Sequence, residues 1–376
     1  MRRMTAVAKK EAREILRDPI TLGIAILLPV IMMFLFAYAI TLDVREIRMV
    51  VFDQDRSAES REYVSSFLQS GYFQLLAYAS HSKDVERLLD RGAVRMALII
   101  PPDFSRRLRQ GLPSEVQTLL DGSFANTAII ASNYVAAING IHNARLQSVY
   151  LAQRFGYSHV ASPIKVEPRV RYNPELRSVN FIIPGLFAVI LMAFPPMLTA
   201  LAVVREREGG SLQQIFSSPI NAREFIGGKM LPYAGIAFLE MGLLLGVGRL
   251  WFGVAVRGNP ILLLLLSLLY VVCTVGIGLL VSTLTKSQVV SVLLAIVLTL
   301  MPSFLFSGFL FPIATMPNFF QYYTYLFPAR YFNEIARGIV LKGIGLESLW
   351  LDVFLILLYA VAVLTFAAVR FRKTID

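Results

Sequence analysis

Residues 261–311 read ILLLLLSLLYVVCTVGIGLLVSTLTKSQVVSVLLAIVLTLMPSFLFSGFLF, and this stretch decides the fold. It holds a single charged residue, Lys286, between two long apolar runs. An α-helix rises about 1.5 Å per residue, so about 20 apolar residues cross the roughly 30 Å hydrocarbon core of a bilayer. The stretch therefore predicts two adjacent transmembrane helices, over residues 261–284 and 289–311.

Four further apolar stretches of similar length occur, at residues 20–42, 181–204, 231–251 and 349–369. Of the 376 residues 56% are hydrophobic and only 16% are charged, a composition outside the range of soluble globular domains. We therefore expect an α-helical polytopic membrane protein with six transmembrane helices. A long polar insert at residues 43–178 separates the first two of them.

Lys and Arg are distributed unevenly between the two sides of these predicted helices. If the N-terminus is cytoplasmic, the cytoplasmic flanks hold fourteen basic residues and the opposite short loops hold five. The fourteen are Arg2, Arg3, Lys9, Lys10, Arg13, Arg17, Arg205, Arg207, Arg223, Lys229, Lys286, Arg370, Arg372 and Lys373; the five are Arg249, Arg257, Arg330, Arg337 and Lys342. Cytoplasmic loops are enriched in basic residues, so we expect both termini inside and the insert outside.

Residues 1–18 predict an amphipathic helix that lies on the inner leaflet. Met4, Ala8, Ala12 and Ile15 fall on one face, and Lys9, Arg13 and Arg17 line another. Asp18 and Pro19 suit the N-cap and first position of the next helix, at residues 19–42. Two alternatives remain, a disordered basic leader and a cleaved signal peptide ending near Ala37-Tyr38-Ala39, although the apolar run is long for a signal peptide.

The insert predicts an α/β domain of its own. Short aliphatic runs bounded by Asp, Pro and Gly predict strands at residues 47–52, 94–100, 115–120 and 165–171. Segments that follow Ser or Asp caps predict helices at residues 57–70, 82–91 and 103–110, and a long helix is expected at residues 126–155. About 135 residues are enough to bury a separate core.

The charges and motifs exclude several kinds of function. The insert has 17 basic and 14 acidic residues, so most of the net charge of +11 flanks the membrane, and nucleic-acid binding is not expected. The sequence contains no G-x-x-x-x-G-K-[ST] phosphate loop, no G-x-S-x-G and no H-E-x-x-H. We therefore expect a chain that is not an enzyme and has no cofactor or metal site.

The polar connection at residues 205–232, REREGGSLQQIFSSPINAREFIGGKMLP, carries a specific resemblance. It is similar to the E-x-G-[ST]-L-[EQ]-Q-L-L-x-[ST]-P and G-K-x-L-P patterns of the ABC-2 permease family. Further matches, which together extend the resemblance over essentially the whole chain, are Tyr172-Asn173-Pro174-Glu175, Phe181-Ile182-Ile183-Pro184-Gly185, Phe327-Pro328-Ala329-Arg330, Asp53-Gln54-Asp55-Arg56-Ser57 and Asp121-Gly122-Ser123. The chain departs from the family at Phe124, where a polar residue is usual.

The resemblance implies the permease subunit of an ABC exporter in the bacterial inner membrane. It implies as partners a separate ABC ATPase, which holds ATP and magnesium, and a second permease subunit, identical or different. Membrane lipid and a periplasmic adaptor are further candidate partners. A permease without nucleotide machinery receives work mechanically, so residues 205–231 are the expected coupling segment. The candidate coupling residues are Arg205, Glu206, Arg207, Glu208, Gly209, Gly210, Ser218 and Pro219.

The expected substrate is amphiphilic, a drug-like molecule or a lipid. The candidate pathway residues are Phe187, Met192, Phe194, Glu240, Met301, Phe304 and Phe306, on predicted helices two, three and five. A carboxylate in mid-membrane costs about 2.5–3.5 kcal/mol, so Glu240 is expected to face protein or water. It either hydrogen-bonds a neighbouring helix or takes part in transport. The resemblance implies re-entrant helices in segment 312–346, and the alternative is that its aromatic residues simply anchor it at the membrane interface.

Two other functions remain open at this point. A proton-coupled secondary transporter could use Glu240 as its relay, although a single carboxylate makes a thin relay and the charged residues show no inverted repeat. A membrane-anchored receptor or scaffold could act through the insert, although six transmembrane helices exceed what anchoring requires. An ATP-driven exporter accounts for more of the sequence than either.

The predicted topology can be tested by labelling single cysteines in a chain whose only native cysteine, Cys273, is replaced by alanine. A membrane-impermeant maleimide added to intact spheroplasts should modify cysteines at positions 60, 120 and 160. Cysteines at positions 215 and 373 should react only after the membrane is opened. Labelling of position 120 only in opened membranes would contradict the topology.

Overall fold

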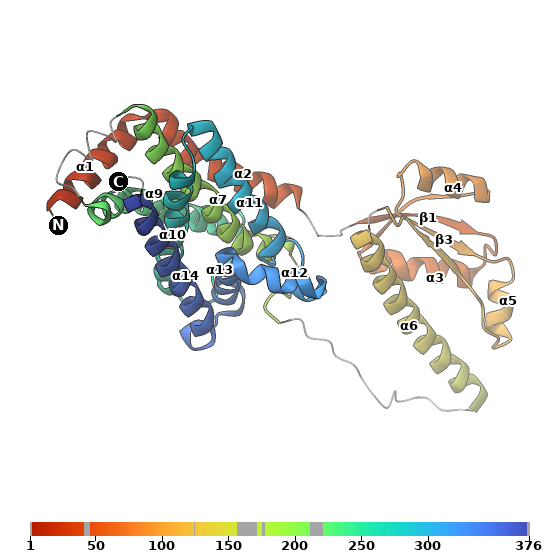
Figure 1. Ribbon diagram of the computed structural model, residues 1–376. Helices are drawn as coiled ribbons and strands as arrows, with labels where there is room; N and C mark the ends of the chain where they lie inside the picture. The colour runs from red at the N-terminus through yellow and green to blue at the C-terminus, as the bar shows by residue number, and fades with distance from the viewer. Residues whose placement is uncertain are drawn as a thin grey trace. The chain divides into compact units, whose positions relative to one another are not determined.

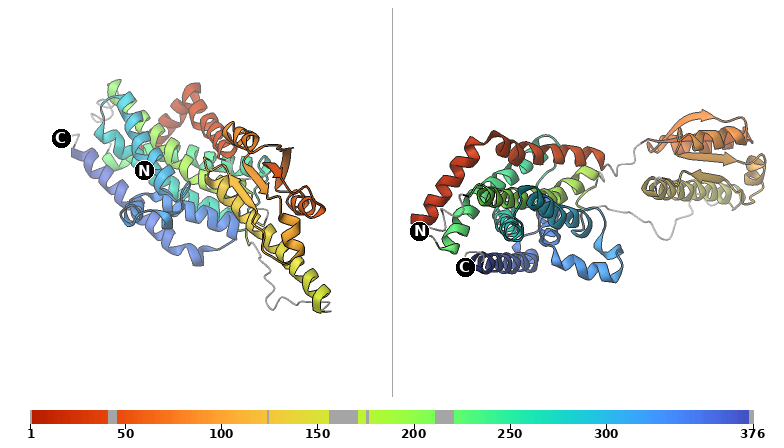
Figure 2. Two further views of the ribbon diagram at one scale, coloured as in Figure 1. Left: turned by 90° about the vertical axis from the view of Figure 1, so that its right-hand side faces the viewer. Right: turned by 45° about the horizontal axis from the view of Figure 1, so that its top comes forward.

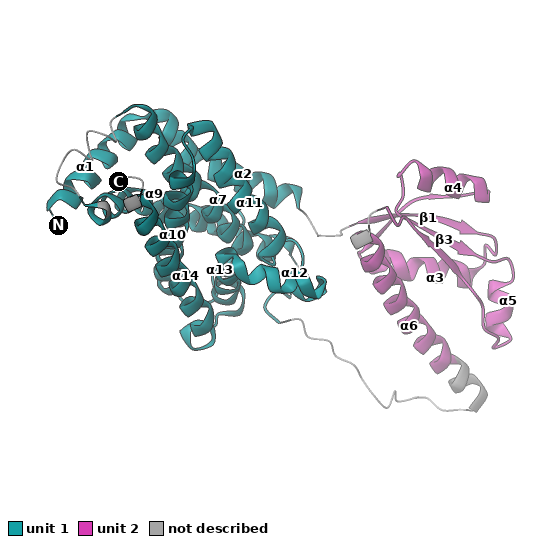
Figure 3. Ribbon diagram, viewed as in Figure 1, with its two compact units in different colours: residues 1–41, 170–376 teal, residues 42–169 magenta. Residues whose placement is uncertain are grey.

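A computed structural model describes residues 2–40, 46–123, 125–155, 171–174, 177–210 and 221–373. The chain divides into two compact units, residues 1–41 with 170–376, here called the membrane unit, and residues 42–169, the inserted domain (Figure 3). The two units are described separately. The mostly helical membrane unit and the small sheet of the inserted domain confirm the predicted fold class.

Six helices of the described chain are long and apolar enough to span a membrane. They are α2 (Pro19–Ala39), α7 (Ser178–Glu208), α9 (Ala222–Leu250), α10 (Pro260–Leu284), α11 (Gln288–Phe306) and α14 (Leu346–Lys373). Helix α1 (Arg2–Arg17) precedes them and packs against α9. Both termini lie at the same end of this unit, which we call the terminal end (Figure 1).

Three predicted helix ends are wrong, and one of them is the start of α9, which begins at Ala222, nine residues before the predicted residue 231. Helix α7 continues to Glu208, so residues 205–208 form its last turn and do not belong to a loop. The helix ends there because Gly210 adopts a left-handed backbone conformation with φ of 73°. Helix α11 stops at Phe306, five residues early, and Gly308 turns the chain with φ of 76°. In α7 and α11 a glycine just past the last helical turn sets the end, whereas the apolar composition alone does not.

Helix α7 occupies the middle of the membrane unit (Figures 1 and 2). Of its most apolar stretch of 18 residues, 83% are buried. Helices α2, α9, α10 and α11 surround it, and α14 packs on the far side of α10. Tyr270 of α10 fixes this arrangement, because its hydroxyl donates to the carbonyl of Ala188 in α7 at 2.8 Å. Its ring stacks on Phe332 with centroids 4.2 Å apart, which joins a third helix to the contact.

The segment between α11 and α14 contains several short helices at the end of the unit opposite the termini. They are η1 (Ile313–Thr315), α12 (Asn318–Tyr323), η2 (Thr324–Leu326), α13 (Pro328–Arg337) and a π-helical turn η3 (Gly338–Lys342). Helix α13 is buried against α7 and α14, whereas Phe319 and Tyr322 of α12 are each 75% exposed. The aromatic segment therefore has one buried helix and one exposed helix.

The inserted domain contains a four-stranded sheet in the order β2-β1-β3-β4. Strands β1 (Ile47–Asp53), β2 (Phe73–Tyr78) and β3 (Met96–Ile100) are parallel, and β4 (Gln117–Leu120) runs antiparallel to β3. Helices α3 (Ala58–Gln69), α5 (Phe104–Arg109) and α6 (Ala125–Phe155) pack on one face, and α4 (Ser82–Asp90) packs on the other (Figure 1). Alternate residues of β1 reach the two faces, as Met49 and Val50 show.

Three predicted strands match β1, β3 and β4, but β2 was not predicted. Its sequence, FQLLAY, contains Gln, Leu and Ala, which do not favour strands. Its position at the edge of the sheet leaves most of its side chains exposed or half-buried, so it lacks a continuous apolar run. The predicted strand at residues 165–171 falls almost entirely outside the described residues. Phe124 also lies outside them.

The family motif that begins at Asp53 has a structural role at the end of β1. Asp53 Oδ1 accepts hydrogen bonds from the backbone N–H groups of Asp55 (3.0 Å) and Arg56 (2.9 Å). Ser60 donates to its other oxygen at 2.6 Å, which ties the start of α3 to the strand. Asp55 in turn accepts from the backbone and hydroxyl of Ser105 in α5. These bonds position two helices beside the sheet.

The contact between α7 and α10 gives a stability prediction at Gly278. A Cβ atom there would lie 2.8 Å from the Cα of Pro196 and 2.9 Å from the Cβ of Thr199, and backbone atoms cannot move aside cheaply. We expect Gly278→Ala to destabilise the purified protein by about 1–3 kcal/mol through overpacking. Gly246→Ala is the matched control, because nothing lies within 4 Å of its Cβ position, and alanine there favours the helix. Equal melting temperatures of the two variants in detergent would contradict this packing.

Candidate functional site

The amphipathic helix α1 is attached to the membrane unit by a very close contact with α9. Val7, Glu11 and Ile15, at helical spacing, are the residues of α1 that are most buried. At Gly228 of α9, a Cβ atom would lie 2.7 Å from the Cβ of Val7 and 2.9 Å from the carbonyl oxygen of Met4. Only glycine lets the two helices approach this closely, so the Gly-Lys family motif has a packing role here.

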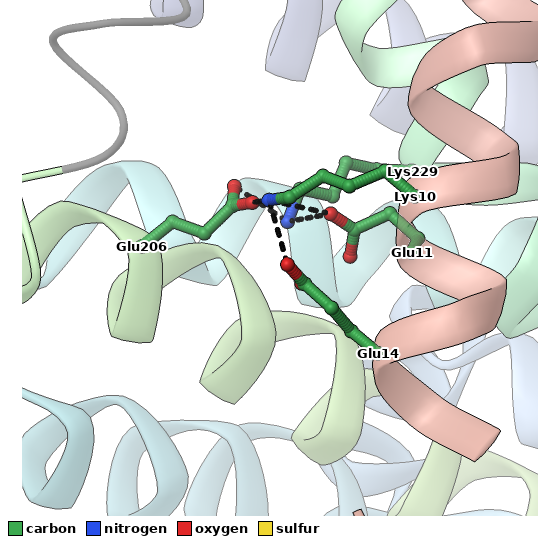
Figure 4. Close-up of polar contacts among 5 residues, drawn as sticks. All are labelled: Lys10, Glu11, Glu14, Glu206 and Lys229. Atoms are coloured by element: carbon green, nitrogen blue, oxygen red, sulfur yellow. Dashed lines mark hydrogen bonds and ion pairs between the residues drawn. The ribbon is translucent and has the colours of Figure 1, made fainter. Parts of the chain in front are cut away.

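This contact brings Glu11 next to Lys229, and both side chains are almost fully buried. The Lys229 Nζ atom lies 2.8 Å from Glu11 Oε1 and 2.6 Å from Glu206 Oε2. Lys10 also pairs with Glu206, and its Nζ lies 3.2 Å from Glu14 Oε1. Figure 4 shows the two lysine ammonium groups between the three carboxylates. We call these five residues from three helices, α1, α7 and α9, the charge network.

Ion pairing makes the burial of these charges possible. Burial raises the pKa of the Glu11 carboxyl above its usual value, although the Lys229 ammonium opposes the rise. For Lys10, burial acts to lower the pKa, but the hydrogen bond to Glu206 and the surrounding carboxylates outweigh it, so the pKa is raised. Removal of one partner would leave an uncompensated buried charge, which is far more costly than loss of an exposed pair.

The three carboxylates of the network lie as close together as the ligands of a metal ion do. Glu11, Glu14 and Glu206 each offer an oxygen within 4.8 Å of the others. The ammonium groups of Lys10 and Lys229 already lie among these oxygens and supply the positive charge that a cation would bring. The arrangement holds three helices together.

The other charged residues of the last turn of α7 are also engaged within the chain. Arg205 donates to Asp18 at 2.9 Å, and Asp18 accepts from the backbone N–H groups at the start of α2, as an N-cap does. Arg207 donates to the carbonyls of Ser282 and Thr285 at the end of α10. The Glu208 carboxylate accepts from the backbone N–H of Gln288 at the start of α11, at 3.0 Å. This turn therefore contacts the start of α2, the end of α10 and the start of α11.

The structure thus places the expected coupling residues as follows. Arg205, Glu206, Arg207 and Glu208 bind other helices of the membrane unit, and Gly209 and Gly210 end α7. Ser218 and Pro219 lie outside the described residues. Lys10, Glu11 and Glu14 were not singled out from the sequence, and Lys229 was noted only for its charge and its place in a motif. A charged residue in the middle of the apolar face of α1, Glu11, was the available signal.

The expected pathway residues are not brought together in this single chain. Phe187, Met192 and Phe194 are buried inside the bundle by neighbouring helices. Met301 of α11 is 61% exposed. Phe304 packs against Phe36 of α2, with ring centroids 4.8 Å apart, and Phe306 stacks within the aromatic segment on Phe320 and Phe327.

Glu240 lies in the middle of α9, and its side chain is only 2% exposed. Neither of its carboxyl oxygens has a hydrogen-bond partner among the residues that the structure describes. The hydrogen bond to a neighbouring helix that the sequence analysis considered is therefore not found there. Glu240 lies against a groove between α1, α2 and α9, and the other residues that line this groove are apolar.

At the opposite end of the unit, polar side chains of α13 satisfy the broken end of α11. Arg337 donates to the carbonyls of Gly308 (2.8 Å) and Phe309 (3.1 Å). Asn333 donates to the carbonyl of Ser307 at 2.8 Å. The Arg337 guanidinium also lies over the ring of Phe181 in α7, at 3.6 Å from its centroid. These contacts attach α13 to both α7 and α11.

Comparisons with known proteins agree with this architecture. The model of a family described as "ABC-2 family transporter protein" matches residues 19–369. The chain is 30% identical, over its whole length and 98% of the relative's, to the probable multidrug ABC transporter permease YbhS of Escherichia coli K12. It is 28% identical to the probable multidrug ABC transporter permease YbhR of the same organism, with 99% of both chains covered.

A more distant relative is ABC transporter G family member 20 of Dictyostelium discoideum, at 24% identity over 97% of this chain and 50% of the relative. Both bacterial relatives are similar along their full length, and the family model covers all six helices that are long and apolar enough to span a membrane. The resemblance noted in the sequence motifs is thereby confirmed. The chain belongs to the ABC-2 family of transporters.

Proposed function

We propose that this chain is the permease subunit of an ABC exporter that moves an amphiphilic substrate outward across the bacterial inner membrane. A separate ATPase subunit supplies the energy, and both termini of the chain are cytoplasmic. Two relatives that match it over their full length are named probable multidrug ABC transporter permeases, which favours export of drug-like molecules. The excess of Lys and Arg at the terminal end supports the orientation.

The division of labour follows from the family and the sequence. Membership of the ABC-2 family implies that the chain has an ABC ATPase as a partner. The sequence has no phosphate-binding loop, so ATP and magnesium are assigned to that partner and this chain is assigned no catalytic site. The work of ATP hydrolysis must then arrive as a movement of the permease surface.

The observation that carries the proposal is the charge network, whose residues Glu206 and Lys229 stand in sequence on either side of residues 209–221. These residues connect α7 to α9, and the network joins the last turn of α7 to the first turns of α9 and to α1. A displacement of the connection by a docked ATPase would move these three helices as one body. Because α7 runs through the middle of the membrane unit, such a displacement would reach its whole interior.

A second permease subunit fits the exposed face of α11. Val290, Leu293, Val297 and Met301, each more than half exposed, form one stripe at helical spacing. We propose that this stripe faces the second subunit and that Phe304 and Phe306 lie beside the pathway between the two. Phe187, Met192 and Phe194 would reach that pathway only if α7 turned or separated from its neighbours, as alternating access requires.

A proton-coupled transporter is the second candidate, because Glu240 is buried without a partner in the described part of the chain. The two candidates differ in their source of energy. The reconstituted complex of permease and ATPase in proteoliposomes should accumulate a fluorescent amphiphilic dye when ATP is added, whatever the pH gradient. A non-hydrolysable ATP analogue should stop accumulation. Transport that follows an imposed pH gradient and ignores ATP would favour the proton-coupled candidate.

The charge network can be tested with Lys229→Met, which leaves the buried carboxylates of Glu11 and Glu206 without their shared ammonium. Breaking a buried ion pair costs about 3–5 kcal/mol, so we expect a clearly lower melting temperature. Lys9→Met makes the same chemical change on the exposed face of α1 and should have almost no effect. Adding Glu11→Gln to Lys229→Met should recover much of the lost stability, because fewer buried charges remain unpaired.

The stable double variant then separates folding from coupling. If the network transmits the movement, the double variant should move fewer dye molecules for each ATP hydrolysed than the native complex, although it folds. A native ratio of transport to hydrolysis in the double variant would show that the network only stabilises the fold.

A further inference from the structure

The groove beside Glu240 has the size and the lining of a binding site. It lies between α1, α2 and α9 and has a volume of about 530 Å³, within the range of known ligand pockets. Leu16 of α1, Ile26 of α2 and Leu239 of α9 form its apolar walls. These three side chains are 72%, 48% and 72% exposed, so the groove is open along the apolar surface of the membrane unit.

Glu240 is the one residue of this lining that can be charged. It stands eleven positions after Lys229 in α9, so it is separated from the charge network by about three helical turns of apolar residues. Burial of a carboxylate without a hydrogen-bond donor is strongly unfavourable, and such groups normally have a partner. No described residue supplies one here. The groove therefore combines an open apolar surface with an unsatisfied acceptor that is buried in its wall.

We propose that this groove binds a cationic amphiphile, a molecule with a protonated amine and a long apolar chain, which enters from the lipid. The amine donates to the Glu240 carboxylate and neutralises its charge, and the chain lies against the walls formed by α1, α2 and α9. A neutral amphiphile of the same length can donate a hydrogen bond but brings no positive charge to pair with the carboxylate, and an anionic one brings a like charge. This proposal rests on the proposed export function in one respect, namely that it takes such amines to be the class of substrate that is exported.

The position of the groove explains how a ligand bound there could affect the packing of the other helices of the permease. Ile15 of α1 lines the groove, while Glu11, one turn earlier on the same helix, belongs to the charge network. Pro232 of α9 also lines the groove, three residues after Lys229. A ligand that separates α1 from α9 would therefore act directly on the contact that holds the network together.

The test is saturation binding of radiolabelled dodecylamine to the purified full-length permease in nanodiscs, with empty nanodiscs subtracted. We expect saturable binding, with 1-dodecanol competing about tenfold or more weakly, because it lacks the charged hydrogen bond. Glu240→Gln should raise the Kd for dodecylamine about tenfold or more and bring it close to that of the alcohol. Asp352→Asn, which alters a carboxyl of α14 outside the groove, should leave binding unchanged.

A second variant, Gly235→Phe, tests the groove itself without altering a charge. Nothing lies within 4 Å of the Cβ position of Gly235, so a larger side chain can extend into the groove without displacing the backbone. It should abolish saturable binding of dodecylamine. The control is Gly246→Phe, because the Cβ position of Gly246 also has nothing within 4 Å but lies outside the groove; this variant should bind dodecylamine normally.

Several results would overturn the site. Equal affinity of the native protein and Glu240→Gln for dodecylamine would remove the role of the carboxylate. Unchanged binding in Gly235→Phe, together with an altered oligomeric state, would mean that a second copy covers the groove. Binding is measured without the ATPase, so a failure of ATP-dependent transport would count against the proposed function and leave this site standing.

Discussion

The hydrocarbon core of a membrane offers no water, so every polar group placed there must find its partner within the protein. The rest of this structure depends on that constraint. At the terminal end, three carboxylates and two ammonium groups from three helices pair with one another. At the opposite end, Arg337 and Asn333 satisfy the carbonyls left free where α11 stops. Glu240 departs from this rule, because neither oxygen of its buried carboxyl group has a partner among the described residues, and the groove that we propose as a binding site lies beside it.

The transmembrane helices could be predicted from the sequence because apolar length is a local property. All six appear, and the helices of the inserted domain agree with their predicted ranges to within a few residues. The wrong predictions of helix and strand bounds occurred where contacts with other parts of the fold decide the local structure. Residues 205–208 are polar but continue α7, because their charges have partners on other helices. The edge strand β2 has no strong preference of its own and forms because β1 lies beside it.

The candidate site was harder to predict than the fold. Glu206 was selected from a local motif, but its main partners, Lys10 and Lys229, are distant in the sequence, Lys10 by 196 positions. No pattern along the chain could show that the three meet. Glu240 was identified correctly as a buried carboxyl, since its neighbours in α9 are apolar, but the lack of a partner and the groove beside it depend on how α1 and α2 pack. The local sequence thus indicated which charged residues stand in apolar surroundings, whereas the packing of the helices determines the partners of each one.

The shared ammonium of Lys229 has a consequence for how this protein can change over evolution. Glu11, Glu206 and Lys229 lie on three different helices, and both carboxylates share the ammonium of Lys229, so its loss makes both buried carboxylates costly. Substitutions there are tolerated mainly in compensating combinations. Among related permeases these three positions should therefore be inherited together or replaced together, although they stand far apart in the sequence.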